Sequence, residues 1–82
     1  PEEVAEAKRA RLVVAVQARL DSRAQARGYD SILSAASYAT SLHPTFGPEG
    51  ISYRNWRDSV WDHCYKALAD VQAEAARLLA AL

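Results

Sequence analysis

Cysteine is almost missing from this sequence of 82 residues, since Cys64 is the only one. A single cysteine cannot form a disulfide within the chain, which argues against a disulfide-stapled secreted scaffold and favours a reducing compartment such as the cytoplasm. We therefore expect one domain, residues 1–82, around a hydrophobic core that is only just large enough to hold without cross-links or metal.

Net charge and long apolar segments are missing as well. Ten Lys and Arg balance ten Asp and Glu, so no overall field draws the chain toward nucleic acid or an anionic membrane, and any binding must be local. The longest apolar run, residues 12–16, is far shorter than the roughly 18–20 residues of a membrane span. The acidic start, residues 1–3, does not resemble a signal peptide. We expect a soluble protein without a membrane partner.

Glycine and proline are absent from residues 2–27, where alanine and straight-chain charged residues dominate. This composition predicts a first helix over about 2–27, which Gly28 closes by adopting a left-handed conformation. Asp30 or Ser31 can then accept hydrogen bonds from the free N–H groups of a short second helix, about 31–41.

The first substantial interruption follows this second helix. Pro44 and Gly47 predict a loop over residues 42–47, because proline pushes the preceding residue out of the helical region. Pro48 suits the first position of a helix, and the chain then continues without a further break. We expect a third helix over about 48–81.

The third helix has an unusually wide apolar face. On a helical projection this face spans about 180°, against roughly 100° for a typical surface helix. One neighbouring helix cannot cover it, so we expect an all-α fold of three helices (long, short, long), in which the first and third form an antiparallel hairpin and the short second helix packs between or across them. The wide apolar face of the third helix is covered either by the first and second helices together or by these two helices and a second molecule. We favour the arrangement with a second molecule. The central stripe consists of Tyr53, Trp56, Val60, Cys64, Ala67, Leu68, Val71, Ala75, Leu78 and Leu82.

The tripeptide Asp62-His63-Cys64 contains residue types that are used for nucleophilic catalysis. Consecutive helical side chains point about 100° apart, so these three cannot form a hydrogen-bonded relay. Cys64 is better interpreted as a small core residue, with Asp62 and His63 on the solvent face. His43 has no neighbour at metal-ligand spacing. We therefore predict no catalytic, cofactor-binding or metal-binding residues.

Arg19, Arg23 and Arg27 recur at every fourth position and form a ridge along the first helix. Such a ridge could meet a phosphate backbone, but arginines also line the margins of apolar faces, and Asp58 and Asp62 are available as ion-pair partners. With zero net charge and no recognition motif, nucleic-acid contact through the three arginines is the weaker hypothesis.

Aromatic residues and arginines gather in the first half of the third helix, and these are the residue types enriched at protein interfaces. Trp56 is expected in the three-helix core, and Trp61 on the margin of the stripe. Arg57 falls within the apolar arc, so it needs either a stacked position on a tryptophan or a carboxylate from another element. The candidate protein interface consists of Tyr53, Trp56, Arg57, Trp61, Tyr65 and Leu79.

Residues 27–39 read RGYDSILSAASYA, and Glu49-Gly50, Trp56-Arg57 and Val60-Trp61 follow at fixed spacing. Over about residues 13–72 this pattern resembles small proteins that tailed bacteriophages and prophages encode near their tail-fibre genes. The resemblance implies a non-enzymatic tail-associated or tail-assembly protein, made in the bacterial cytoplasm, with virion association as a further option. The implied partner is a tail-fibre component or a second copy of the chain. A small DNA-associated regulator using the arginine ridge is the alternative function.

Overall fold

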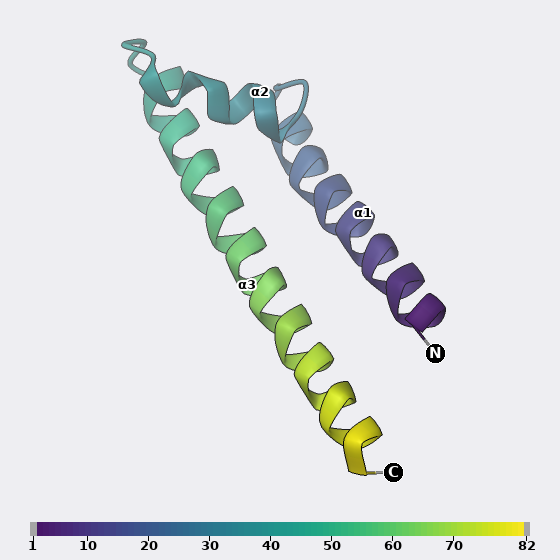
Figure 1. Cartoon of the computed structure of the whole chain (residues 1–82). Coiled ribbons are helices and arrows are strands. Elements are labelled where there is room, and N and C mark those ends of the chain that lie inside the picture. Colours follow the sequence, from purple (N-terminus) through teal and green to yellow (C-terminus); the bar gives the residue numbers. More distant parts are fainter. Residues whose placement is uncertain (1, 82) are drawn as a thin grey trace.

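The computed structural model describes residues 2–81, with side chains from residue 6 onward. Helix α1 spans Glu2–Ala26, α2 spans Ile32–Ser37, a single 3₁₀ turn η1 spans Tyr38–Thr40, and α3 spans Phe46–Ala81. The long helices α1 and α3 run antiparallel as two arms, and α2 crosses between them at one end (Figure 1). This confirms the expected all-α fold with a long, a short and a long helix, the short one packed against both others.

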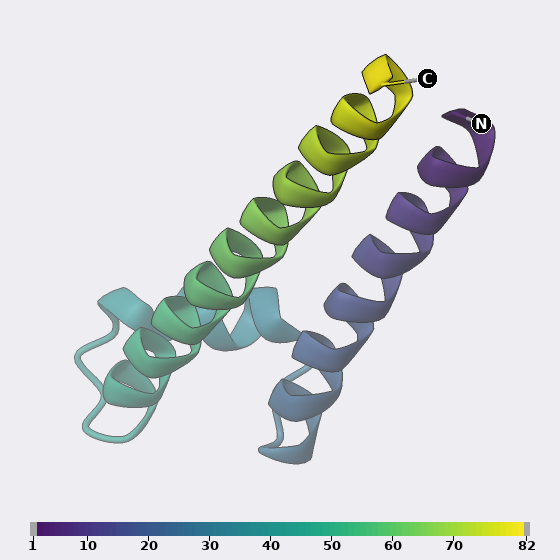
Figure 2. The same ribbon diagram turned by 90° about the horizontal axis from the view of Figure 1, so that it is seen from below.

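Both views show the arms side by side along their length (Figure 2). We call the end that α2 joins the closed end, and the opposite end, where α1 begins and α3 finishes, the open end. Of the two long helices, α3 has 36 residues and α1 has 25. Extra turns of α3 therefore have no counterpart in α1.

Local hydrogen bonds fix the ends of α1 and α2. Gly28 has φ 105°, a left-handed conformation that glycine adopts without steric cost, and the N–H of Tyr29 donates to the carbonyl of Ala24 over 3.0 Å. Ser31 caps α2, because its hydroxyl oxygen accepts from the N–H of Ser34 over 3.2 Å. Of the two residues predicted as caps, the structure uses Ser31.

The start of α3 lies two residues before Pro48, at Phe46. His43 explains this early start, since its Nδ1 atom accepts from the N–H groups of Thr45, over 3.1 Å, and Phe46, over 3.2 Å. An imidazole nitrogen here replaces the hydroxyl or carboxylate of a usual cap. The connection between η1 and α3 is therefore shorter than the predicted loop 42–47, and the second helical segment is divided into α2 and η1.

The buried core lies at the closed end. Leu20 and Ala24 from α1 meet Ile32 and Ala35 from α2, and all four are almost fully buried. Asp21 ties the two helices together by accepting from the N–H of Ile32 over 3.0 Å. Half-buried side chains surround this cluster, namely Val16, Tyr29, Tyr53, Trp56, Val60 and Trp61.

Helix α2 packs on the hairpin of α1 and α3 only at the closed end, because it has just six residues. The radius of gyration is 16.9 Å, against about 12 Å expected for a compact chain of this length. We define the distal arms as residues 6–14 of α1 and 65–81 of α3. Their exposed large apolar side chains are Leu12 (41%), Val14 (69%), Tyr65 (51%), Val71 (65%), Leu78 (60%) and Leu79 (70%).

Packing within the single chain therefore covers the wide apolar arc only near α2. Leu82, which the projection placed on the central stripe, lies outside the described residues. Within residues 2–81, no helix combines the length and the apolar character that crossing a bilayer requires.

Candidate functional site

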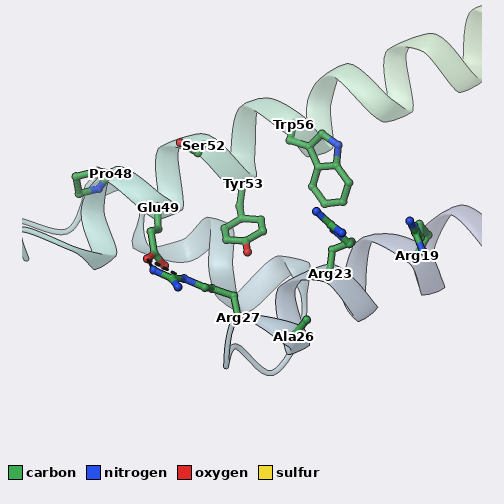
Figure 3. A pocket seen from close by; sticks show the side chains of 9 residues that line it. All are labelled: Arg19, Arg23, Ala26, Arg27, Pro48, Glu49, Ser52, Tyr53 and Trp56. Carbon is green, nitrogen blue, oxygen red and sulfur yellow. Dashed lines mark hydrogen bonds and ion pairs between the residues drawn. The ribbon is translucent and has the colours of Figure 1, made fainter.

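A groove runs between α1 and α3 at the closed end and has a volume of about 970 Å³. This volume is near the upper end of the roughly 300–1,000 Å³ typical of ligand pockets. Figure 3 shows that α1 contributes arginines to one wall and α3 contributes aromatic side chains to the other. The principal lining residues are Arg19, Arg23 and Arg27 on α1, and Glu49, Tyr53 and Trp56 on α3.

Arg27, Tyr29 and Glu49 form a hydrogen-bonded network at one end of the groove. Arg27 donates to Glu49 Oε1 from Nη2 over 2.5 Å and from Nε over 3.0 Å, and the Tyr29 hydroxyl donates to Oε2 over 2.8 Å. The Arg27 hydrogen bonds, and then that from Tyr29, lower the pKa of Glu49. Burial, followed by the hydrogen bond to Glu49, raises the pKa of Tyr29. Glu49 thus joins the end of α1 to the first turn of α3 as a carboxylate.

Replacing Glu49 by glutamine is expected to flatten the acid dependence of stability. A carboxylate whose pKa is lowered by folding stabilises the native state above its ordinary pKa of 4.5, and this contribution is lost as the pH falls below that value toward the folded pKa. Urea unfolding between neutral pH and pH values below 4.5 measures the effect. The wild type should lose more stability than Glu49→Gln over this range.

Glu74→Gln is the matched control, since Glu74 lies on α3 but pairs only with Arg77 on the exposed distal arm. This variant should keep the acid dependence of the wild type. Parallel pH profiles for the wild type and Glu49→Gln would contradict a stabilising carboxylate at Glu49.

Arg19 and Arg23 form the free part of the arginine ridge. Both side chains are exposed, and neither makes an ion pair among the described residues. In Figure 3 the guanidinium group of Arg23 points toward the ring of Trp56 across the groove. The two cations therefore lie beside an aromatic wall, where an acidic or planar group could contact both.

The ion pairs proposed for the ridge from the sequence are wrong. Asp58 pairs with Arg57 over 3.0 Å, and Asp62 pairs with Lys66 over 2.9 Å. The carboxylate that satisfies Arg57 therefore comes from the next residue of the same helix, and not from another element as one interpretation of the sequence required. The Arg57 side chain is 30% exposed, so most of its length is covered by neighbouring atoms.

The aromatic residues of the predicted interface divide into two groups. Tyr53 and Trp56 contact each other edge to face, with ring centroids 6.4 Å apart, and both line the groove. Trp61 and Tyr65 stack with centroids 5.7 Å apart and do not line it. Leu79 lies farther along the open end and is exposed. The structure thus brings Tyr53 and Trp56 together with the arginine ridge, and leaves Trp61, Tyr65 and Leu79 on another part of α3.

The residues with catalytic side-chain types do not assemble into a site. Asp62 and His63 are exposed, whereas Cys64 is a buried free thiol. No hydrogen bond joins these three residues in the structure. Within the part of the chain that the structure describes, no group of three His, Cys, Asp or Glu side chains is arranged to hold a metal ion.

Sequence reasoning did not identify the contact of Glu49 with Arg27 and Tyr29. Glu49 was recognised as an acidic residue in the first turn of a helix, but its partners are 22 and 20 residues away, and helical periodicity gives no signal at such separations. Comparison of the chain with protein-family models, with curated proteins and with solved structures gave no match.

Proposed function

We propose that this chain is a non-enzymatic phage tail-associated or tail-assembly protein that acts through protein–protein contacts of its distal arms. The exposed apolar side chains of these arms are the observation that carries the proposal. The tail context rests on the resemblance of residues 13–72 to phage tail-region proteins, and with it the expectation of synthesis in the bacterial cytoplasm.

The accessible surface supports an interaction role. The chain exposes 6217 Å², whereas a compact protein of 9.0 kDa should expose about 4,850 Å². The excess of roughly 1,400 Å², polar and apolar atoms together, reflects the elongated two-armed shape of the chain. Six of the eleven exposed large apolar side chains lie on the distal arms, and the other five lie between residues 33 and 51 at the closed end. The arms are the proposed contact surface because their exposed apolar residues follow two long antiparallel helices, against which a partner helix can pack.

Co-elution with a phage tail-fibre protein is the direct test. We expect a complex by size-exclusion chromatography with light scattering, because the apolar arms would be covered in it. Leu78→Glu places a charge on the distal α3 arm and should weaken the complex at least tenfold, since the charge would be desolvated there. Leu42→Glu is the matched control, because Leu42 is 99% exposed in the connection after η1.

A chain that forms no complex with the tail-fibre protein and also has the mass of one copy at every concentration would contradict the proposed function. A complex that Leu42→Glu disrupts as strongly as Leu78→Glu would show that the contact lies outside the distal arms.

A small DNA-associated regulator is the second candidate, because Arg19 and Arg23 are exposed without ion pairs. Two features weaken it. First, Arg27 already forms an ion pair with Glu49. Second, the three arginines line a groove, whereas binding along a DNA duplex would need them on an open surface. A salt-dependent shift of duplex DNA that Arg19→Gln combined with Arg23→Gln abolishes would favour this candidate over tail association.

A further inference from the structure

One face of α3 carries a heptad pattern that continues past the end of α2. We call this set the seam. Successive members are separated by four, three, four, three and four residues, the spacing of positions that face a partner helix in coiled coils. Trp61 packs against the core at the closed end, whereas Tyr65 and Leu79 are 51% and 70% exposed. The seam consists of Trp61, Tyr65, Leu68, Gln72, Ala75 and Leu79.

The sizes of the seam residues favour one orientation of a second helix. The bulky aromatic pair, Trp61 and Tyr65, occupies one end, and Ala75 lies toward the other. In an antiparallel pair of α3 helices related by a twofold axis near residue 70, Trp61 faces Leu79, Tyr65 faces Ala75, and Leu68 faces Gln72. The bulky Tyr65 then meets the small Ala75, and Trp61 meets a leucine in place of a second tryptophan.

A parallel pair would place identical residues opposite one another. Trp61 would meet Trp61 and Tyr65 would meet Tyr65, so the helices would be forced apart there, while facing Ala75 residues would leave a void. The order of sizes along the seam is therefore self-complementary only in the antiparallel orientation, which is the orientation that an isologous twofold dimer provides.

We infer that the distal arms bind a second copy of this chain, with two α1 and two α3 arms forming an antiparallel four-helix bundle around a twofold axis near residue 70. This inference rests on the proposed function and names the partner of the same arms. Trp61 is the last seam residue that packs against the core at the closed end, and Tyr65, the next one, is exposed. The second copy would therefore cover the face of α3 that begins where α2 ends.

The area available matches a stable dimer. The accessible surface of the chain exceeds that of a compact protein of the same mass by roughly 1,400 Å². The smaller obligate homodimers bury about 1,000 Å² per chain, so the elongated arms have enough surface for such an interface. Alanines beside the seam, among them Ala69 and Ala76, permit two α3 helices to approach closely. A single short peptide from a tail fibre would cover less of this surface.

Cysteine cross-linking tests both the partner and the orientation. Ala69 and Ala76 occupy equivalent positions one heptad apart and are both exposed. In a Cys64→Ala background, Ala69→Cys lies next to the proposed axis and should form an intermolecular disulfide under mild oxidation. Ala76→Cys is the matched control, because its two copies would be roughly 20 Å apart along the helix axes.

Two outcomes would overturn the inference. Equal cross-linking at both positions would show a parallel arrangement, and no cross-linking at either, together with the mass of one chain, would show that no second copy binds. Circular dichroism of each variant verifies that the helices are intact.

Sedimentation of Leu79→Glu provides a measurement that does not depend on oxidation. The mass should fall from two chains to one, with a dissociation constant raised at least 100-fold, since each dimer would bury two unpaired carboxylates. Helix content should be unchanged, because Leu79 is 70% exposed within the single chain. His63→Glu, on the opposite face of α3, should remain dimeric.

The mass of the wild type separates failure of this inference from failure of the proposed function. A monomer that binds the tail-fibre protein would overturn the second copy while leaving the proposed function standing. A dimer that binds no tail-fibre protein, disrupted by Leu79→Glu and not by His63→Glu, would support the second copy and count against a tail-fibre partner.

Discussion

Gly50→Val is expected to lower the free energy of unfolding by about 3 kcal/mol, because it introduces atoms where two backbone segments meet. A Cβ atom at this position would lie 2.5 Å from the backbone nitrogen of Ala39 and 2.5 Å from the carbonyl carbon of Tyr38. Both atoms belong to η1, so neither can move aside as a flexible side chain would. The turn and α3 must separate to admit the new side chain.

Urea unfolding followed by circular dichroism measures this change. Valine also has a lower helix propensity than most residues, so Ser59→Val serves as the control at an exposed position of the same helix. This control should stay within about 0.5 kcal/mol of the wild type. Equal losses in the two variants would mean that the approach of η1 to α3 contributes nothing to stability.

Gly50 also illustrates what the sequence could not predict. In the sequence, Gly50 is a helix-weakening residue near the start of a helix. In the structure, its missing side chain allows the backbone of η1 to pack directly against α3, a contact between segments that the sequence pattern does not reveal. The long, short and long helices were predictable, because they depend on local composition and breaks. The early start of α3 was not, because it depends on the imidazole of His43 reaching forward to two backbone N–H groups.

The candidate site was predictable only in parts. The arginine ridge was identified from its spacing, and Tyr53 and Trp56 as two of the six residues of an interface rich in aromatic residues, but these were competing sites on different helices. The structure places them on opposite walls of one groove. The side of each helix that faces a third element depends on where α2 crosses, and helical periodicity carries no information about that crossing.

The closed end and the distal arms have different roles in this arrangement. Leu20, Ile32 and the network around Glu49 hold the two long helices at one end, whereas the distal arms have little to hold them in a single chain. Association of two copies would order the arms that the closed end has already aligned, which reduces the conformational entropy lost on binding. Stability and association should therefore be coupled through the closed end.

Leu20→Ala tests this coupling and should lower the free energy of unfolding by about 3 kcal/mol. Leu20 is 1% exposed and is the largest fully buried side chain in the described part of the structure, so its truncation leaves a cavity between α1 and α2. Total stability is expected to be about 4–12 kcal/mol for a chain of this length, which makes the loss a large fraction. Leu42→Ala removes the same atoms from a residue that is 99% exposed, and should be nearly neutral.

Both leucine variants must be unfolded at one protein concentration, because association adds to stability by mass action. Repeating the comparison in the Leu79→Glu background separates the two contributions. If the closed end folds without the second copy, the difference between Leu20→Ala and Leu42→Ala should persist in that background. A difference that disappears there would show that the core around Leu20 forms only after the distal arms have paired.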